Sequence, residues 1–292
     1  MYKAIERNKL NTVLIMGVFI ALIGAIGWAV SYLNGGDPSI GVTILVIGVI
    51  YALIQYFAAS KLAVAMTGAT EISKSDNPRL YRIVENLAIT TGMPMPKVYM
   101  IDDPAPNAFA TGRSPKDAIV GVTTGLLEIM NDNELEAVMA HEMGHVQNYD
   151  IRVSTIAFGL VSLVGFISDI ALRSLIFSDD RDNNSSPIVL IVGLVVIILS
   201  PVIAMMTQMA ISRQREYLAD ATSVMTTRHP DGMTSALAKL EQFGKPMKKQ
   251  NSATANLFLS NPLKKSFFSK AFSTHPDIAD RIARINENKD RF

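Results

Sequence analysis

Two histidines and a glutamate lie close together near the middle of this 292-residue chain, in the sequence Ala140-His141-Glu142-Met143-Gly144-His145-Val146. Residues four apart lie on the same face of an α-helix, so His141 and His145 can both direct an imidazole toward one metal ion. In the His-Glu-x-x-His pattern two neutral imidazoles bind zinc, and the glutamate, here Glu142, is the general base toward a water molecule. The chain has only four histidines, so two unrelated surface histidines are the weaker interpretation.

A helix is expected to position these residues. Asn131 and Glu134 have the spacing of a capping box, in which each side chain binds a main-chain N–H group at the start of a helix. Apolar residues then recur every three or four positions, at Leu135, Val138 and Met139. The sequence therefore predicts that both histidines lie on a helix and not in a loop.

The composition narrows the class of protein and the kind of site. Hydrophobic residues make up 49% of the chain, which is high for a soluble protein and implies a membrane portion. The net charge is only +1, and no sustained basic patch with interleaved aromatic residues suggests nucleic-acid binding. There is no cysteine, so disulfides, thiol nucleophiles and cysteine-based metal sites are excluded. A metal ion must be bound by histidines and carboxylates.

Four apolar runs indicate membrane segments, and the first two form a pair. They cover residues 12–33 and 40–59, and each is long enough to span a bilayer as a helix. Lysine and arginine occur at the outer ends of the pair but not in the turn between them, which predicts that both outer ends are cytoplasmic. Residues 1–66 are therefore expected to form an N-terminal transmembrane hairpin.

Residues 151–177 and 188–211 are the third and fourth apolar runs, expected to form a second transmembrane hairpin. The third run contains Asp169 and Arg173, so a shallow hairpin that does not cross the bilayer is the alternative. Lysines within residues 245–270 suit contact with anionic lipid headgroups, although a solvated loop explains them equally well.

The second hairpin, residues 151–211, divides one soluble domain into two parts, residues 67–150 and residues 212–292. The first part carries the His-Glu-x-x-His helix, and the second is polar with helical pieces. Short strands are expected at three places in the first part: residues 96–101, residues 107–112 as an edge strand, and residues 118–122.

A catalytic zinc site needs a third protein ligand, and Glu216 is the leading candidate. If the third and fourth apolar runs are antiparallel, their cytoplasmic ends emerge together. His145 and Glu216 then both lie roughly 8 Å above the membrane, at 1.5 Å per residue. Asp220 follows Glu216 by four residues on the same helix face, where it can hold the other ring nitrogen of a metal-bound histidine.

These motifs together resemble the HtpX family of membrane-bound zinc metalloproteases, to which the prenyl-protein CAAX proteases are related. The resemblance covers essentially the whole chain. Besides the His-Glu-x-x-His helix it is carried, in order, by Asn107-Ala108-Phe109-Ala110, Arg215-Glu216-Tyr217-Leu218-Ala219-Asp220 and Thr274-His275-Pro276.

The resemblance implies one Zn²⁺ per chain, although another divalent ion is the alternative. It implies that His141, His145 and Glu216 bind the metal, that Glu142 is the catalytic base, and that Asp220 supports a ligand. The implied fold is a mainly α integral membrane protein with four transmembrane helices and a cytoplasmic α+β zincin-like protease domain with a small sheet. The expected location is the bacterial inner membrane, with the protease domain and both termini in the cytoplasm.

The substrate side of the site is also implied by the resemblance. The edge strand near Asn107 would receive the substrate backbone, and His275 and Arg281 would lie close enough to assist at the oxyanion. The implied activity is hydrolysis of peptide bonds in misfolded or damaged membrane proteins, as part of quality control under stress. Polypeptides and the lipid bilayer are the expected partners, nucleic acid is not, and no motif indicates an oligomeric state.

Two alternative functions are weighed against this one. An intramembrane, site-specific metalloprotease would bury the motif in hydrocarbon, whereas polar residues at 131–136 and 147–150 flank it here. A membrane scaffold or chaperone would carry a structural metal site with four protein ligands, and Asp220 or His275 would have to be the fourth.

Overall fold

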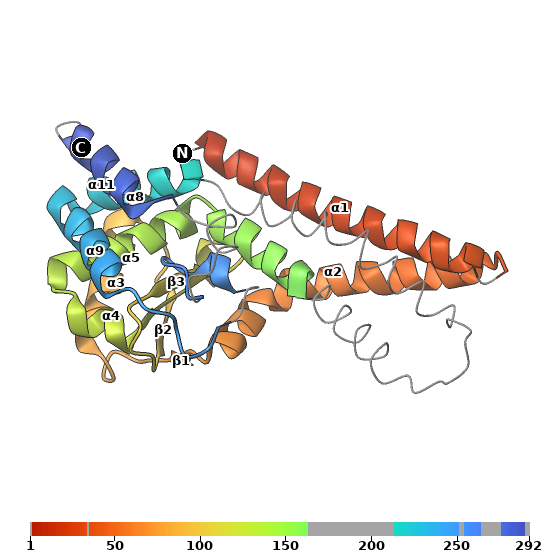
Figure 1. Cartoon of the computed structure of the whole chain (residues 1–292), viewed down its shortest axis with the longest axis horizontal. Coiled ribbons are helices and arrows are strands. Elements are labelled where there is room, and N and C mark those ends of the chain that lie inside the picture. The colour runs from red at the N-terminus through yellow and green to blue at the C-terminus, as the bar shows by residue number, and fades with distance from the viewer. Residues whose placement is uncertain (1, 34, 163–212, 251–253, 264–275, 290–292) are drawn as a thin grey trace.

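Two long apolar helices extend from a mixed α and β domain and lie side by side (Figure 1). They are α1, Tyr2–Leu33, and α2, Pro38–Thr67. The computed structural model describes residues 2–33, 35–162, 213–250, 254–263 and 276–289. Both helices are longer than the predicted apolar runs, so each continues from the expected membrane region to the domain.

Local sequence explains how the hairpin closes. The side chain of Asp37 accepts a hydrogen bond from the main-chain nitrogen of Ser39, and Pro38 takes the first helical position of α2, where its missing N–H costs nothing. Close to the turn, a side-chain carbon at Gly27 would lie 2.9 Å from the carbonyl oxygen of Gly41, so only glycine allows this approach. By length and composition, α1 and α2 are both able to cross a membrane.

A third helical segment, residues 150–162, packs against this hairpin. Its apolar side chains include Val153 and Ile156, which join a buried cluster with Ile15 and Phe19 of α1. The predicted third apolar run begins in this segment. Most of the third and fourth runs falls in residues 163–212, outside the described residues, so their crossing of the bilayer stays a prediction.

The domain contains a four-stranded sheet in the order β1-β2-β4-β3. The central strands β2 and β4 are parallel, while β1 and β3 pair with them antiparallel. The three strands expected from the sequence are confirmed, including β3 as an edge strand of this sheet. The bounds are Thr70–Glu71 for β1, Lys97–Ile101 for β2, Ala108–Thr111 for β3 and Ile119–Thr123 for β4.

Helices surround the sheet, and the expected helix with His141 and His145 lies among them as α5, Asp132–Gln147. Leu135, Val138 and Met139 of α5 are fully buried in the main core, as their spacing predicted. The other described helices of the domain are α3, Pro78–Thr91, α4, Thr124–Ile129, α8, Arg213–Thr227, α9, Pro230–Phe243, and α11, Ile278–Glu287, with short 3₁₀ turns at Pro115–Asp117 and Ala255–Leu257.

Candidate metal centre

The two histidines lie on one face of α5, whose start is fixed by the predicted capping box. The Asn131 side chain accepts from the main-chain nitrogen of Glu134, and the Glu134 carboxylate accepts from that of Asn131. The same carboxylate binds Lys239 of α9 at 2.7 Å, which ties the helix start to its neighbour. The His-Glu-x-x-His motif therefore lies on a buried helix with a fixed start.

Glu216 reaches this face because α8 crosses α5 closely. The crossing is at Gly144, where a side-chain carbon would lie 3.3 Å from Thr222 and 3.5 Å from Ala219 of α8. Ser223 of α8 also donates a 2.6 Å hydrogen bond to the carbonyl oxygen of Ala137. Glycine within the motif thus allows the second helix to approach.

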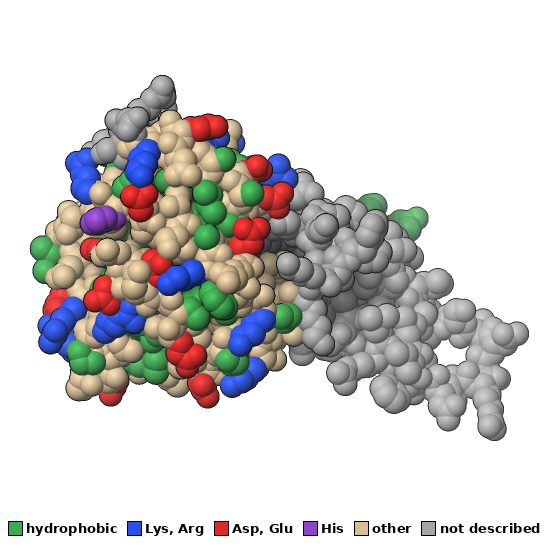
Figure 2. All heavy atoms as spheres, turned by 60° about the vertical axis from the view of Figure 1, so that its left-hand side comes forward, with side chains coloured by type: hydrophobic (Ala, Val, Ile, Leu, Met, Phe, Trp, Pro, Cys, Tyr) green, Lys and Arg blue, Asp and Glu red, His purple; other side chains and the backbone are tan. Residues whose placement is uncertain are grey.

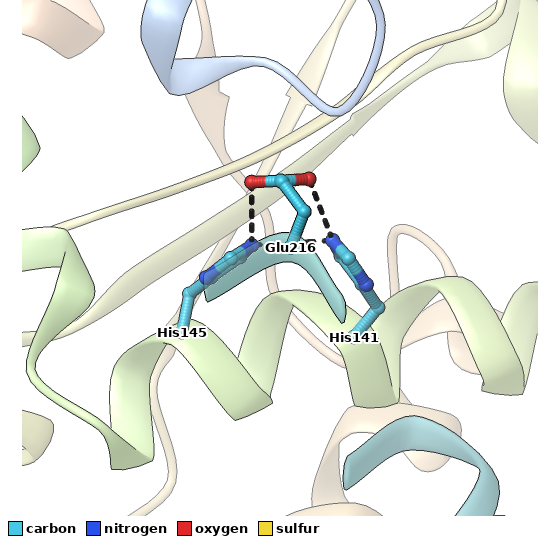
Figure 3. Close-up of side chains that lie close together, drawn as sticks. All are labelled: His141, His145 and Glu216. Atoms are coloured by element: carbon cyan, nitrogen blue, oxygen red, sulfur yellow. Dashed lines mark hydrogen bonds and ion pairs between the residues drawn. The ribbon is translucent and has the colours of Figure 1, made fainter. Parts of the chain in front are cut away.

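His141, His145 and Glu216 point toward one another (Figure 3). The Nε2 atoms of the two rings are 3.1 Å apart. The Glu216 carboxylate lies 3.7 Å from Nε2 of His141 and 3.5 Å from Nε2 of His145. All three potential ligand atoms lie within 4.8 Å of one another, so residues more than seventy positions apart meet at one point, as the sequence predicted.

The outer ring nitrogens are each held by a carboxylate. Nδ1 of His141 lies 2.9 Å from Asp220, and Nδ1 of His145 lies 2.9 Å from Asp150. A carboxylate can only accept, so each Nδ1 carries a proton, and an imidazole that is neutral then presents the lone pair of its Nε2 inward. Two lone pairs and a carboxylate facing one point repel each other unless a cation lies between them. The donor set therefore fits a divalent metal ion that is bound by nitrogen and oxygen.

The surroundings give the two imidazoles opposite pKa shifts. Burial lowers the pKa of His141 to about 4, although Asp220 opposes this shift. Burial also disfavours the charged form of His145, but the hydrogen bond with Asp150 and the charge of Glu216 outweigh it and raise the pKa to about 9. In the metal-free protein at neutral pH, a proton on His145 thus supplies positive charge between the acceptors.

Arg281 of α11 lies beside both His141 and Asp220, with its Nη2 atom 3.4 Å from Nδ1 of His141. Its Nε and Nη2 atoms donate to the two oxygens of Asp220 at 2.9 and 2.6 Å, which is the bidentate geometry. Burial would raise the pKa of Asp220, but the guanidinium outweighs it and the pKa falls to about 2. Arg281 is fully buried, and Nη1 is 3.9 Å from Glu216. It therefore faces the metal ligands and is bound to Asp220.

Glu142 follows His141 on α5 and is 2% exposed. Its negative charge contributes to the raised pKa of His145 and also acts on Arg281. The Glu142 carboxylate therefore lies close enough to the ligand cluster to act on the charges of His145 and Arg281.

Asn107 precedes β3, but its side chain is engaged by another part of the chain. The amide nitrogen donates to the carbonyl oxygen of Ser260 at 2.7 Å, and the amide oxygen accepts from the nitrogen of Ser260 at 3.0 Å. Further along the edge, Leu259 donates its N–H to the carbonyl oxygen of Ala108, and Phe258 pairs with Phe109 as an isolated antiparallel bridge. We call residues 258–260 the cover segment, because it lies along the outer edge of β3.

Of the other two histidines, only His229 is among the described residues, and it is not part of the cluster. His275, expected near the oxyanion, lies outside the described residues. His229, for which the sequence suggested no function, is exposed at the start of α9.

On the face of the domain shown in Figure 2, acidic and basic side chains are intermingled without a large area of one sign.

Asp150 was missed by the sequence analysis, which treated residues 147–150 only as polar flanks of the motif. The distance of five residues from His145 was the available signal, but an ideal helix would place residue 150 about 140° around from residue 145. Here α5 ends at Gln147, and Tyr149 has a φ angle of 61°, in the left-handed region. This turn brings Asp150 back to His145.

A helix with two metal-facing histidines and an adjacent glutamate, joined by a carboxylate from a second helix, is the arrangement of a metallopeptidase. Residues 74–289 match peptidase family M48. The chain therefore belongs to peptidase family M48, and the predicted resemblance to HtpX is confirmed by its relatives.

Two of these relatives are named "Protease HtpX homolog". The protein of Tropheryma whipplei (strain Twist) is 55% identical over 292 residues, which is the full length of both chains. The protein of Lactobacillus helveticus (strain DPC 4571) is 44% identical over 297 residues, covering 98% of this chain and 99% of the other. Among solved structures, Ste24p of S. mikatae has a TM-score of 0.51 at 20% identity, covering 98% of this chain and 67% of that chain, which supports the fold. The chain is thus a membrane metallopeptidase.

Proposed function

We propose that this protein is a zinc-dependent endopeptidase of the bacterial inner membrane that cleaves polypeptides at the cytoplasmic surface. The observation that carries the proposal is the convergence of His141, His145 and Glu216 on one point, beside Glu142. These three side chains would hold one Zn²⁺ and leave a coordination position open, as catalytic zinc sites do.

Bound zinc would lower the pKa of a water molecule and polarise the carbonyl of the scissile peptide bond. Glu142 would take a proton from the attacking water and then deliver it to the leaving amine. Asp220 and Asp150 would keep the two imidazoles in the tautomer that presents Nε2. Arg281, bound to Asp220 through two nitrogens, would fix that carboxylate and balance its buried charge.

A structural metal site is less consistent with this geometry. It requires four protein ligands. Asp220, one of the two candidates for the fourth, lies on the Nδ1 side of His141 and is paired with Arg281, so it faces away from the convergence point. This favours the enzyme over the scaffold or chaperone.

Substrate is proposed to bind as an extended strand beside β3. Main-chain hydrogen bonds to a sheet edge tolerate many side chains, which suits the disposal of misfolded or damaged membrane proteins in quality control. The cover segment pairs with this edge at Ala108 and Phe109. A substrate strand therefore has to displace the cover segment before it can pair along the whole edge.

Cleavage at the surface, rather than within the bilayer, is supported by the length of α1. The candidate span in α1 has 28 residues and is about 42 Å long at 1.5 Å per residue, whereas the hydrocarbon core is about 30 Å thick. The span is therefore about 12 Å longer than the hydrocarbon core is thick. This extra length would lie outside the bilayer, at the end of α1 that contacts the protease domain. We infer a four-span organisation, with residues 1–66 and 151–211 in the membrane and residues 67–150 and 212–292 forming the protease domain.

The test is a proteolysis assay on purified protein in detergent, with an unfolded protein such as casein as substrate. Wild type should lose activity with a chelator and regain it when Zn²⁺ is added. Glu142→Gln keeps the shape of the side chain but removes the base, so it should retain zinc and lose at least a hundredfold in rate. Cleavage by Glu142→Gln at the wild-type rate would refute the assignment of the base.

A further inference from the structure

Asn8 is a buried polar residue in the charged N-terminal part of α1, before its apolar run. Its side chain is in the first turns of the helix, and the residue is only 4% exposed. The amide nitrogen donates to the carboxylate of Asp150 at 2.6 Å and to the carbonyl oxygen of Asn148 at 2.9 Å. Both partners lie about 140 positions away in the sequence, immediately after α5. The amide nitrogen of Asn8 therefore uses both of its donor hydrogens inside the protein.

The contact with Asp150 leads directly to a metal-facing histidine. Oδ1 of Asp150 accepts from Asn8, while Oδ2 lies 2.9 Å from Nδ1 of His145. The two oxygens of one carboxylate therefore join α1 to the ring of His145. The carboxylate is 4% exposed, so its orientation depends on these partners and not on water.

Arg215 completes the group from the side of α8. Its Nε lies 3.9 Å from Oδ1 of Asp150, and Nη1 lies 3.5 Å from the amide oxygen of Asn8. Arg215 precedes Glu216, the third metal-facing residue. Asn8 thus lies between the end of the helix with the two histidines and the start of the helix with the glutamate.

The contact with Asn148 acts on the backbone. Asn148 is the C-cap of α5, and its carbonyl group lies beyond the last helical hydrogen bonds, where an orphan acceptor needs a partner. Asn8 supplies that partner. It therefore holds both the end of α5 and the carboxylate that orients His145.

We propose that Asn8 is a positioning residue of the metal centre, acting through Asp150, so that the N-terminal membrane helix forms part of the site. The proposal rests on the proposed metal site but not on the proposed substrate. Groups that orient metal-binding histidines typically change metal affinity by about 10- to 100-fold. Asn8 supports such a group, so its removal should weaken zinc binding by roughly tenfold.

The test measures the zinc dissociation constant of the full chain in detergent by competition with a chromogenic chelator. Asn8→Ala is expected to raise this constant roughly tenfold. Asn8→Asp, of the same shape but without the N–H donors, places a second carboxylate beside Asp150 and should raise it at least as much. The matched control is Asn11→Ala, one turn further along α1, which should stay within about twofold of wild type.

A double-variant cycle separates positioning from a general loss of structure. Asp150→Ala should weaken zinc binding by itself, and adding Asn8→Ala to it should have little further effect, because the two residues act in series. The visible spectrum of the Co²⁺-substituted protein should change in Asn8→Ala and not in Asn11→Ala. If Asn8→Ala does not fold in detergent, Asn8→Ser keeps a small hydrogen-bonding side chain and takes its place.

Two results would overturn the proposal. One is a zinc dissociation constant for Asn8→Ala, or for Asn8→Ser if that is used, within twofold of wild type. The other is that Asn8→Ala raises the zinc dissociation constant by the same factor in the Asp150→Ala variant as in wild type. Because the readout is metal affinity, the outcome is independent of whether the wild-type enzyme cleaves casein.

Discussion

His141 and His145 bind the same kind of partner through Nδ1, yet their environments give them different charges when no metal is present. Nε2 of His145 faces Glu216 at 3.5 Å and its ring is held by Asp150, which raises its pKa to about 9. His141 shares its carboxylate partner with Arg281, and its pKa falls to about 4 through burial. A metal ion that binds to this site at neutral pH therefore has to displace a proton from His145.

This difference predicts how the stability of the metal-free protein depends on pH. The folded pKa of His145 lies above its ordinary value of 6.5, so the stabilisation is fully present below pH 6.5 and is lost as pH rises through 9. The loss amounts to about 3 kcal/mol, because one pKa unit corresponds to about 1.4 kcal/mol. Thermal unfolding of chelated protein should show a falling melting temperature between pH 6.5 and pH 9.5.

His145→Gln is the control for this pH dependence, since glutamine does not titrate. The chelated variant should have a melting temperature that changes much less over the same pH range. Zinc-loaded wild type should also lose the dependence, because the metal replaces the proton. An equal pH dependence in chelated wild type and His145→Gln would contradict the assignment.

For single residues, the sequence predicted those that are related to one another by helical spacing. His141, Glu142 and His145 follow from helical spacing, and Asp220 follows from the same rule applied to Glu216. Asp150 could not be found this way, because the left-handed turn at Tyr149 replaces helical geometry between it and His145. Arg281 was expected near the site, but its pairing with Asp220 depends on the packing of α11 against α8, which no local pattern specifies.

Among the elements, α5 and α8 cross at the candidate metal centre, and β3 is the edge strand of the sheet. The sequence predicted α5 from its capping box and periodic apolar residues. It also placed an edge strand at residues 107–112 and helical spacing between Glu216 and Asp220. Glu216 could be placed beside the histidines only by assuming that two apolar runs return side by side. The cover segment was not predicted, because an isolated bridge such as Phe258 with Phe109 has no periodic signal.

The cover segment gives a prediction about substrate affinity. The rings of Phe258 and Phe109 pack with centroids 5.7 Å apart in an edge-to-face arrangement. Such a pair contributes about 0.5–1.5 kcal/mol, so Phe258→Ala should loosen the cover segment and lower KM for an extended peptide about two- to tenfold, with kcat little changed. Steady-state kinetics measures both constants. Phe243→Ala, at an exposed phenylalanine on α9, is the control.

An increase in KM for Phe258→Ala would show instead that the cover segment helps to bind substrate. In that case the peptide would not pair with the edge of β3 at Ala108 and Phe109. The proposed metal site would be unaffected by that result, because Phe258 packs on Phe109 of β3, which is not one of the three ligands.

Across the whole molecule, the hairpin of α1 and α2 and the protease domain meet beside the candidate metal centre. Residues 150–162 pack on α1 and α2, and Asn8 brings α1 to Asp150. The sequence predicted the hairpin from hydropathy, and α1 and α2 agree with its first two runs. It did not predict that α1 reaches the site, because a contact across about 140 positions leaves no local pattern.

Zinc stoichiometry is the decisive measurement of whether residues from two separate helices bind one metal ion. Wild type, Glu142→Gln and Glu216→Ala would be loaded with zinc, passed over a desalting column in detergent and analysed by mass spectrometry for metal. We predict about one zinc per chain for wild type and Glu142→Gln, and a large loss for Glu216→Ala, which lacks one of three ligands. Full zinc occupancy in Glu216→Ala would contradict the account, because the third ligand would then lie elsewhere.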